Sequence, residues 1–273
     1  MAAESGAGAV TGTQAVERAL SLLTCFSAEE SELRSSELSA KTGLGQSTVS
    51  RMVATLERLG FVVQDLRTGL YRLGPTTVKL GSVALNTSTV FRAGRQIAQN
   101  LAGATALGAN LAEFDGEALF YLCNFEGTDA PKSFTMAGRS APLHATGLGK
   151  VILSGQPEDF VREYFKNTPA VSYTPHTVTG LKEMTAALDE VRNRGFATEV
   201  EELAFGRACL AAPVRGRTGE VVAALSVSGP LSAIDLPHRQ QELALRVIEA
   251  ADGISVALGY AASATGMARP VLT

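Results

Sequence analysis

The stretch "GLGQSTVSRMVATLERLGF", residues 43–61, has the spacing of a short turn followed by an amphipathic helix. Gly43 is typical of a left-handed residue that ends one helix, and the next helix is predicted to begin near Gln46. Its apolar side chains fall within an arc of roughly 120° and are predicted to pack inward. These are Val49, Met52, Val53, Leu56 and Leu59.

The opposite face of this predicted helix carries small hydroxyl residues in its first two turns, together with Arg51 and Arg58. Short side chains let a helix backbone approach the edges of DNA bases, and Gln46 and Arg51 have the geometry for bidentate hydrogen bonds to bases. An ordinary amphipathic surface helix shows the same periodicity. The flanking sequence therefore has to decide between the two interpretations.

The residues before this stretch predict two more helices. Residues 13–26 place an apolar face on one side, formed by Val16, Ala19, Leu20, Leu23 and Phe26. A helix of about two turns is predicted to follow, with Ser35 as its N-cap and Leu38 and Ala40 facing inward. The order is helix, tight turn, helix.

The residues after it, "FVVQDLRTGLYRLG" at 61–74, predict two strands joined by a turn at 65–69, with Arg67 at the tip. A helix-turn-helix followed by such a hairpin is typical of a winged DNA-binding module. The predicted DNA-binding residues are Lys41, Gln46, Ser47, Thr48, Ser50, Arg51, Arg67 and Tyr71.

The charge balance agrees with this interpretation locally, although the 273-residue chain has a formal net charge of −3. Residues 41–72 contain five basic and two acidic side chains, so the predicted module carries its own positive field. The three cysteines lie far apart with no CxxC spacing, which argues against disulfides and zinc. No apolar run is long enough to span a membrane, and we expect a cytoplasmic protein with no membrane partner.

The second half of the chain predicts strands covered by helices. "ANLAEF" (109–114) and "ALFYLCNF" (118–125) flank a hairpin turn at Asp115-Gly116, and residues 181–194 predict a helix with Leu181, Met184, Leu188 and Val191 inside. Strands at 196–202, 208–214 and 221–229 follow, and a closing helix runs from about 237 to 259. Antiparallel strands with helices over them predict an α+β domain of the sensor type.

No motif in the chain predicts catalysis. "HATGLGKV" (144–151) lacks the first glycine and the Ser or Thr of a phosphate-binding loop, and neither a G-x-S-x-G elbow nor an H-E-x-x-H pair occurs. The three histidines are scattered and are predicted to be surface or capping residues. We therefore expect no catalytic residue, no metal and no cofactor.

A ligand pocket is better supported. Thr146 is predicted to cap a helix whose first N–H groups, at Gly147 and Leu148, suit a carboxylate. Ser226 and Ser228 are two apart on one strand and face the same side. Because no arginine lies in either segment, we expect hydrogen bonds, and not an ion pair, to hold the carboxylate.

Five segments together resemble the IclR family of bacterial transcriptional regulators, over residues 13–259. They are "AVERALSLL" (15–23), "SSELSAKTGLGQSTVSRMVATLERLGF" (35–61), "YRLG" (71–74), "APLHATGLGK" (141–150) and "GFATEVEELAFGRACLAAPVRGRTGEVVAALSVSGP" (195–230). The resemblance implies a winged helix-turn-helix domain at 13–75, a linker helix at 76–90 and an effector-binding domain of GAF/profilin-like α/β fold at 91–260. Residues 1–12 and 261–273 are predicted to be flexible tails.

The resemblance also implies a ligand-responsive repressor or activator that acts as a homodimer or homotetramer on a pseudo-palindromic operator. Residues matching Gly147, Leu148, Glu199, Cys209, Ser226 and Ser228 would line its effector cavity, and Thr146 and Leu203 complete our predicted site. Cys209 is predicted to be a small buried hydrophobe and not a redox sensor.

We expect a small organic acid as effector, either an aromatic acid or a small oxo-acid. Leu148, Leu203, Phe205 and Leu210 would supply apolar contacts to its carbon skeleton. The alternatives are a small-molecule hydrolase and a non-DNA interaction adaptor on the same fold.

Overall fold

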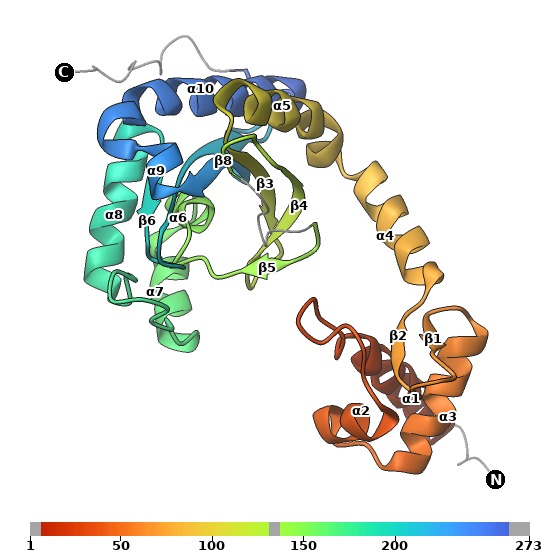
Figure 1. The fold of residues 1–273 in the computed structure, drawn as a ribbon. Helices are drawn as coiled ribbons and strands as arrows, with labels where there is room; N and C mark the ends of the chain where they lie inside the picture. Colours follow the sequence, from red (N-terminus) through yellow and green to blue (C-terminus); the bar gives the residue numbers. More distant parts are fainter. Residues whose placement is uncertain (1–6, 131–136, 262–273) are drawn as a thin grey trace. The chain divides into compact units, whose positions relative to one another are not determined.

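The computed structural model describes residues 7–130 and 137–261 and divides into two compact units, one ending at Asn86 and the other beginning at Thr87 (Figure 1). Helix α1 begins at Ala7, inside the stretch predicted as a tail. Residues 1–6 and 262–273, the other parts of the two predicted tails, lie outside the described chain. Among the described residues, no helix is long and apolar enough to cross a bilayer.

The first unit has the predicted winged helix-turn-helix order. Its elements are α1 (Ala7–Leu23), α2 (Ser35–Thr42), α3 (Gln46–Arg58), β1 (Val62–Gln64), β2 (Tyr71–Leu73) and α4 (Pro75–Thr87). The left-handed Gly43 ends α2 as predicted, with φ 69°. Strands β1 and β2 pair antiparallel as the wing. At the wing's turn, the Asp65 carboxylate accepts the N–H groups of Arg67 (2.7 Å) and Thr68 (3.2 Å).

The core of this unit is a small cluster contributed by α1, α2, α3 and β1. Leu38, Val49, Val53 and Leu56 are buried as predicted, and Leu22 of α1 joins them. Each side chain of this kind contributes about 1.5–3 kcal/mol when it is fully buried. The turn between α2 and α3 is therefore held by packing on both sides of Gly43.

Several packing predictions for this unit are wrong. Val16 and Leu20 are 59% and 56% exposed, because α1 contacts the core through Leu22 near its C-terminal end and leaves its other face open. Leu59, expected inside, is the C-cap of α3 and is 51% exposed.

The predictions for the ends of α2 also need correction. Ser35 is its first helical residue and not its N-cap, which is Arg34. The Glu37 carboxylate accepts the backbone N–H of this N-cap residue, Arg34, at 2.6 Å, which is the contact that the third residue makes in a capping box. Ala40, predicted to face inward, is exposed.

The second unit contains one six-stranded antiparallel sheet and six helices in its described part. The strands are β3 (Gly108–Phe114), β4 (Leu119–Phe125), β5 (Ser140–Ala141), β6 (Ala197–Val200), β7 (Arg207–Arg215) and β8 (Val221–Pro230), in the order β5-β4-β3-β8-β7-β6. The helices are α5 (Thr89–Thr105), α6 (Gly147–Ser154), α7 (Glu158–Asn167), α8 (Leu181–Arg194), α9 (Leu231–Ile234) and α10 (Leu236–Ala257), and Ser88 caps α5 by accepting the Phe91 N–H.

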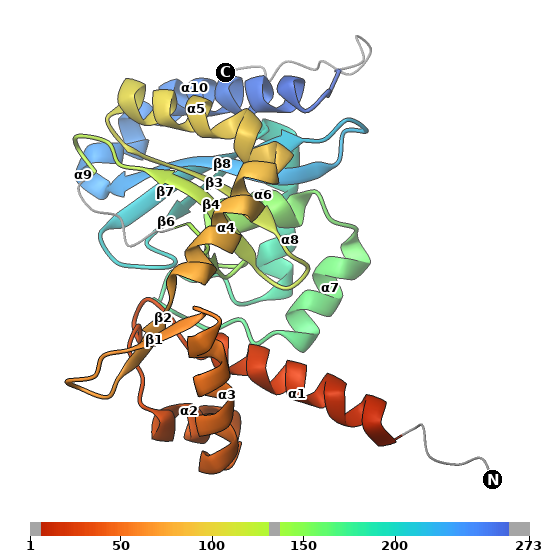
Figure 2. The same cartoon turned by 90° about the vertical axis from the view of Figure 1, so that its right-hand side faces the viewer.

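Two helical layers cover the two faces of this sheet. Helices α5 and α10 lie side by side on one face (Figure 2), and α6 packs against β6, β7 and β8 on the other, with α7 and α8 beyond it. The predicted hairpin at Asp115, the helix from 181 to 194 and the closing helix are all present. Leu181 is the exception on α8, since it lies at the N-terminal end and is 36% exposed.

Helix α6 lies very close to the segment that precedes it, and this closeness positions the helix start described below. Gly149 permits it, because a Cβ at this residue would overlap the backbone of Leu143. Every residue of α6 from Gly147 to Leu153 is buried. The helix start therefore has no room to shift.

We predict that Gly149→Ala lowers the free energy of unfolding by about 1–3 kcal/mol, because the added methyl group meets backbone that cannot move away. Gly103→Ala on α5 is the matched control. A Cβ there meets nothing within 4 Å, so the same substitution should be neutral or stabilise by up to about 1 kcal/mol through helix propensity. Urea unfolding of both variants measures the difference, and equal stabilities would contradict this account of the α6 packing.

Candidate functional site

The outer face of α3 has the character predicted for a helix that enters the major groove. Ser47, Ser50 and Arg51 are exposed on it, while Val49 and Val53 on the other side are buried. Small side chains in the first two turns leave the helix backbone accessible, and Arg51 is exposed beside them. That this face reads base edges stays a prediction.

Gln46 and Thr48, also predicted to bind DNA, lie differently. The Gln46 Nε2 donates to Ser35 Oγ at 2.7 Å, which links the starts of α2 and α3 and leaves the second N–H and the amide oxygen of Gln46 for further contacts. Thr48 is half-buried. Gln46 therefore serves as a brace between the two helices in this structure.

The basic residues of the predicted DNA surface differ in their surroundings. Lys41 forms an ion pair with Glu30 at 2.6 Å, and the hydrogen bond to Glu30 raises the pKa of the lysine. A phosphate would have to replace this carboxylate as its partner. Arg51 and Arg67 are exposed, one on α3 and one at the wing tip. These two side chains are the better placed for DNA contacts.

Tyr71 belongs to the core of the first unit more than to its surface. Its side chain packs against the buried cluster, and burial raises the pKa of its phenol. Its backbone exchanges two hydrogen bonds with Leu33, at 2.8 and 2.9 Å, which attaches the wing to the segment before α2. Sequence periodicity did not predict that Leu33 would pair with strand β2 of the wing.

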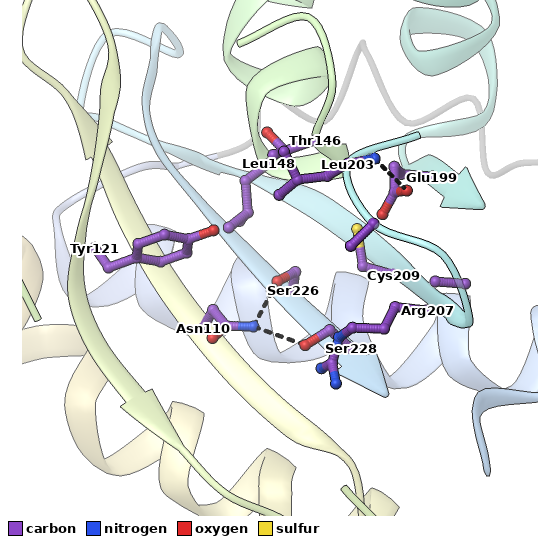
Figure 3. Close-up of a pocket in the computed structure, with 12 residues that line it drawn as sticks. Asn110, Tyr121, Thr146, Leu148, Glu199, Leu203, Arg207, Cys209, Ser226 and Ser228 are labelled. Carbon is purple, nitrogen blue, oxygen red and sulfur yellow. Dashed lines mark hydrogen bonds between the residues drawn. The ribbon is translucent and has the colours of Figure 1, made fainter. Parts of the chain in front are cut away.

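A cavity of about 80 Å³ opens in the second unit beside α6, on the face of the sheet away from α5 and α10 (Figure 3). Seven of the eight predicted effector-binding residues line it. Its lining residues are Asn110, Tyr121, Thr146, Leu148, Glu199, Leu203, Ala204, Arg207, Ala208, Cys209, Ser226 and Ser228.

Strand register brings the polar residues of this cavity together from four strands. Ser226 of β8 pairs with Asn110 of β3, and Ser228 pairs with Cys209 of β7, which in turn pairs with Glu199 of β6. Directly paired residues of an antiparallel sheet lie on the same face. One face of the sheet therefore presents a patch of polar groups to the cavity.

The start of α6 faces this patch. As predicted, Thr146 caps the helix, and its hydroxyl accepts the Gly149 N–H at 2.9 Å. Gly147 does not line the cavity itself. It packs on Cys209, whose sulfur would lie 2.7 Å from a Cβ at this residue. Leu148 is the helix-start residue that reaches the cavity, with its backbone N–H on the first turn.

Glu199 is a buried carboxyl at the other end of the cavity. Burial raises its pKa, and two backbone N–H groups partly oppose this shift, because its Oε1 accepts from Glu202 N at 2.6 Å and Leu203 N at 3.3 Å. Burial also raises the pKa of the neighbouring Cys209 thiol well above its usual value. The thiol form is thus favoured, although Cys209 is only half-buried and lines the cavity.

The loop at 201–206, which supplies Leu203 and Ala204, is held by a buried ion pair. Lys150 of α6 contacts the Glu202 carboxylate, and its Nζ also donates to Thr198 O at 3.3 Å. The second carboxylate oxygen of Glu202 is buried without a hydrogen-bond partner in the described part of the chain. Removing one charge of such a pair typically costs about 3–5 kcal/mol.

Three polar residues of the cavity were not predicted. Asn110 and Tyr121 come from β3 and β4, where no local motif marked them, and Arg207 begins β7. Arg207 corrects the expectation that no arginine would take part. Its side chain extends toward Ser228 (Figure 3), which lies diagonally across from it on the paired strand. A cation therefore stands at the serine end of the cavity.

Three other expectations for this unit are wrong. Phe205 is 66% exposed, and Leu210 is fully buried and absent from the cavity lining, because it alternates with Cys209 along β7. His144, expected at the surface, is 2% exposed and lies 3.0 Å from Val171 O through Nε2. Of the four residues predicted to give apolar contacts to the ligand, only Leu148 and Leu203 line the cavity.

Comparison with known proteins gives matches over both units. Residues 15–66 match the model of the IclR helix-turn-helix domain, and residues 83–256 match that of the bacterial transcriptional regulator IclR C-terminal domain. The HTH-type transcriptional regulator XynR of Escherichia coli is 31% identical over 252 residues, which cover 91% of this chain and 98% of that protein.

Solved structures give matches of the same extent. A putative IclR transcriptional regulator from Silicibacter superposes with a TM-score of 0.78 at 26% identity, and the match covers 92% of this chain and 98% of that one. An IclR homolog from Microbacterium hydrocarbonoxydans, complexed with 4-hydroxybenzoate, has a TM-score of 0.77 at 22% identity, covering 89% and 98%. This last likeness concerns the fold.

We predict that Glu199→Gln gains stability relative to the wild type as the pH rises. The folded-state pKa of Glu199 is raised, so ionisation in the fold costs the wild type free energy above the ordinary value of 4.5, and the full cost is present above the folded-state pKa. Below pH 4.5 the stability advantage of Glu199→Gln should vanish, because the wild-type carboxyl is then protonated in both the folded and the unfolded state. Thermal unfolding from pH 4 to 8 measures it.

Glu220→Gln provides a control of opposite sign. Hydrogen bonds from Thr218 lower the pKa of Glu220, so its contribution favours the wild type above the ordinary pKa and disappears as the pH falls. A Glu199→Gln variant whose melting temperature follows the wild type at every pH would show that Glu199 carries no ionisation cost.

Proposed function

The chain belongs to the IclR family of bacterial transcriptional regulators, and we propose that its binding to operator DNA is modulated by a small organic acid held in the second unit. The observation that carries the proposal is the cavity beside α6, which is lined by Ser226, Ser228, Arg207 and the helix-start residue Leu148. Hydroxyls, a guanidinium and the N–H groups of a helix start are all suited to a carboxylate.

The first unit supplies the DNA contact. Arg51 is proposed to read a base edge from α3, and the exposed serines around it to let the helix approach the groove. Arg67 at the wing tip is proposed to contact phosphate, as are Lys41 once released from Glu30 and the hydroxyl of Thr48. The protein is proposed to work in the cytoplasm, where this DNA lies.

The cavity size and lining bear on the ligand. A volume of about 80 Å³ lies below the roughly 300–1,000 Å³ of drug-sized sites, which favours a small oxo-acid. Leu148 and Leu203 provide apolar contacts that also suit a ring, and a protein of this fold has been crystallised with 4-hydroxybenzoate. To admit an aromatic acid, we propose that the loop at 201–206, which supplies Leu203 and Ala204 to the lining, moves outward.

We further propose that the protein is a homodimer or homotetramer, and that ligand occupancy alters the spacing of its DNA-binding modules. Helix α4 has no buried residue, and Val78, Leu80 and Val83 on it are 72%, 55% and 62% exposed. Apolar side chains at this density favour burial against another chain. Two modules would then read the two halves of a pseudo-palindromic site.

Arg51→Ala should weaken binding to the specific operator by about 1–3 kcal/mol and leave binding to random DNA nearly unchanged. Arg67→Ala should weaken both to a similar degree and reduce the salt dependence, because it removes a phosphate contact. Gel shifts with the protein's own upstream region at two salt concentrations measure both effects. Equal losses on specific and random DNA for Arg51→Ala would rule out base reading by this residue.

Ser226→Ala combined with Ser228→Ala should lower acid affinity by roughly 1–3 kcal/mol, the usual loss when hydrogen bonds to a charged group are removed. Binding to DNA without ligand should persist. Titration calorimetry with pyruvate, benzoate and 4-hydroxybenzoate measures the affinity, and Ser140→Ala, exposed on β5, is the control.

Arg207→Gln separates the cation from the hydroxyls. It should lower acid affinity and remove most of its dependence on salt, since the ion pair is the screened part of the interaction. If the double serine variant binds an acid as tightly as the wild type does, the ligand site lies elsewhere.

A further inference from the structure

A chain of side-chain hydrogen bonds runs across three strands to the serine end of the cavity. Asn124 Nδ2 donates to Asn110 Oδ1 at 2.6 Å. Asn110 Nδ2 then donates to both serines, to Ser226 Oγ at 3.3 Å and to Ser228 Oγ at 3.1 Å (Figure 3). Asn110 and Ser226 are 3% and 1% exposed, so their mutual contact is shielded from bulk solvent.

The register of the sheet places these four residues in contact. Asn110 of β3 lies directly between Asn124 of β4 and Ser226 of β8. The residue opposite Ser228 is Gly108, which has no side chain, so the Asn110 amide reaches the second serine as well as the first. One amide group is thereby shared between two hydroxyls.

The direction of these bonds follows from the chemistry of the amide. An amide oxygen only accepts and an amide nitrogen only donates, so a donor on Oδ1 turns Nδ2 toward the serines. Each serine oxygen then acts as an acceptor and has its own proton left to donate. Asn110 is the hydrogen-bond partner of both hydroxyls in the described part of the chain, and both serines line the cavity.

We infer that Asn124 and Asn110 set the direction of the Ser226 and Ser228 protons, and so make this end of the cavity select a carboxylate over the neutral amide of the same acid. The inference rests on the proposed function. Two O–H donors match the two oxygens of a carboxylate, whereas a primary amide brings an NH₂ group that meets a second donor and stays unpaired.

Asn124 is a positioning residue in this arrangement. It does not line the cavity and acts on the ligand only through the Asn110 amide. A purely structural role would change the affinities of an acid and its amide together. A role in proton direction changes them in opposite senses, which makes the acid-to-amide preference the informative measurement.

The test uses Asn124→Asp in the full-length protein. The new carboxylate accepts from Asn110 Nδ2, so the amide turns and presents Oδ1 to the serines. Both hydroxyls then donate to Asn110, and their lone pairs face the cavity. Calorimetry compares pyruvate with pyruvamide, benzoate with benzamide, and 4-hydroxybenzoate with 4-hydroxybenzamide. We expect acid affinity to fall about tenfold or more and amide affinity to rise at least about twofold.

Two further variants make the outcomes distinct. Asn100→Asp, exposed on α5, makes the same substitution elsewhere and should change neither affinity. Asn124→Leu removes the partner without adding charge, and should reduce the preference for the acid several-fold. It also serves if Asn124→Asp does not fold.

The result that overturns the inference differs from the one that overturns the proposed function. If the wild type binds none of the three acids, both fail. If it binds an acid and Asn124→Asp leaves the preference unchanged, or lowers acid affinity while the amide affinity stays constant, only the inference fails. If acid affinity alone falls, repulsion between the acid and the negative charge added by Asn124→Asp explains that fall.

Discussion

The register of β8 between β3 and β7 is the constraint on which the cavity depends. Side chains alternate between the two faces of a strand, so a slip of one residue would carry Ser226 and Ser228 to the face covered by α5 and α10. Apolar burial prevents the slip, because Leu225 and Val227 are fully buried on that other face. The packing of the core therefore also specifies where the polar groups of the cavity lie.

The helix start opposite this strand is positioned by contacts that tolerate little change. Gly149 allows α6 to pack against the backbone of Leu143, and the buried contact between Lys150 and Glu202 ties the same helix to the loop that covers the cavity. A buried pair of this kind adds little net stability compared with apolar packing, since both charges lose their hydration. Its effect here is to hold the loop at 201–206 in one place.

Local signals in the sequence predicted the elements better than their partners. The start of α3 at Gln46 and the Thr146 cap were correct, because turn and cap chemistry involve residues a few positions apart. The apolar face predicted for residues 13–26 was right at Leu23 and Phe26, which pack against the core, and wrong at Val16 and Leu20, because periodicity alone does not show which part of an apolar stripe meets a neighbour. Asn110 and Arg207 were missed for the same reason, since only strand pairing brings them to the predicted serines.

The ionisable side chains at the two ends of the cavity, Glu199 and Arg207, differ in their expected effect on an anion. An ionised Glu199 would repel a bound acid, yet burial raises its pKa and so favours the neutral form. Arg207 lies at the opposite end, diagonal to Ser228, and attracts an anion. The carboxylate of the proposed ligand would therefore face the serines and Arg207, away from Glu199. Because the chain as a whole is acidic, this orientation depends on local placement and not on net charge.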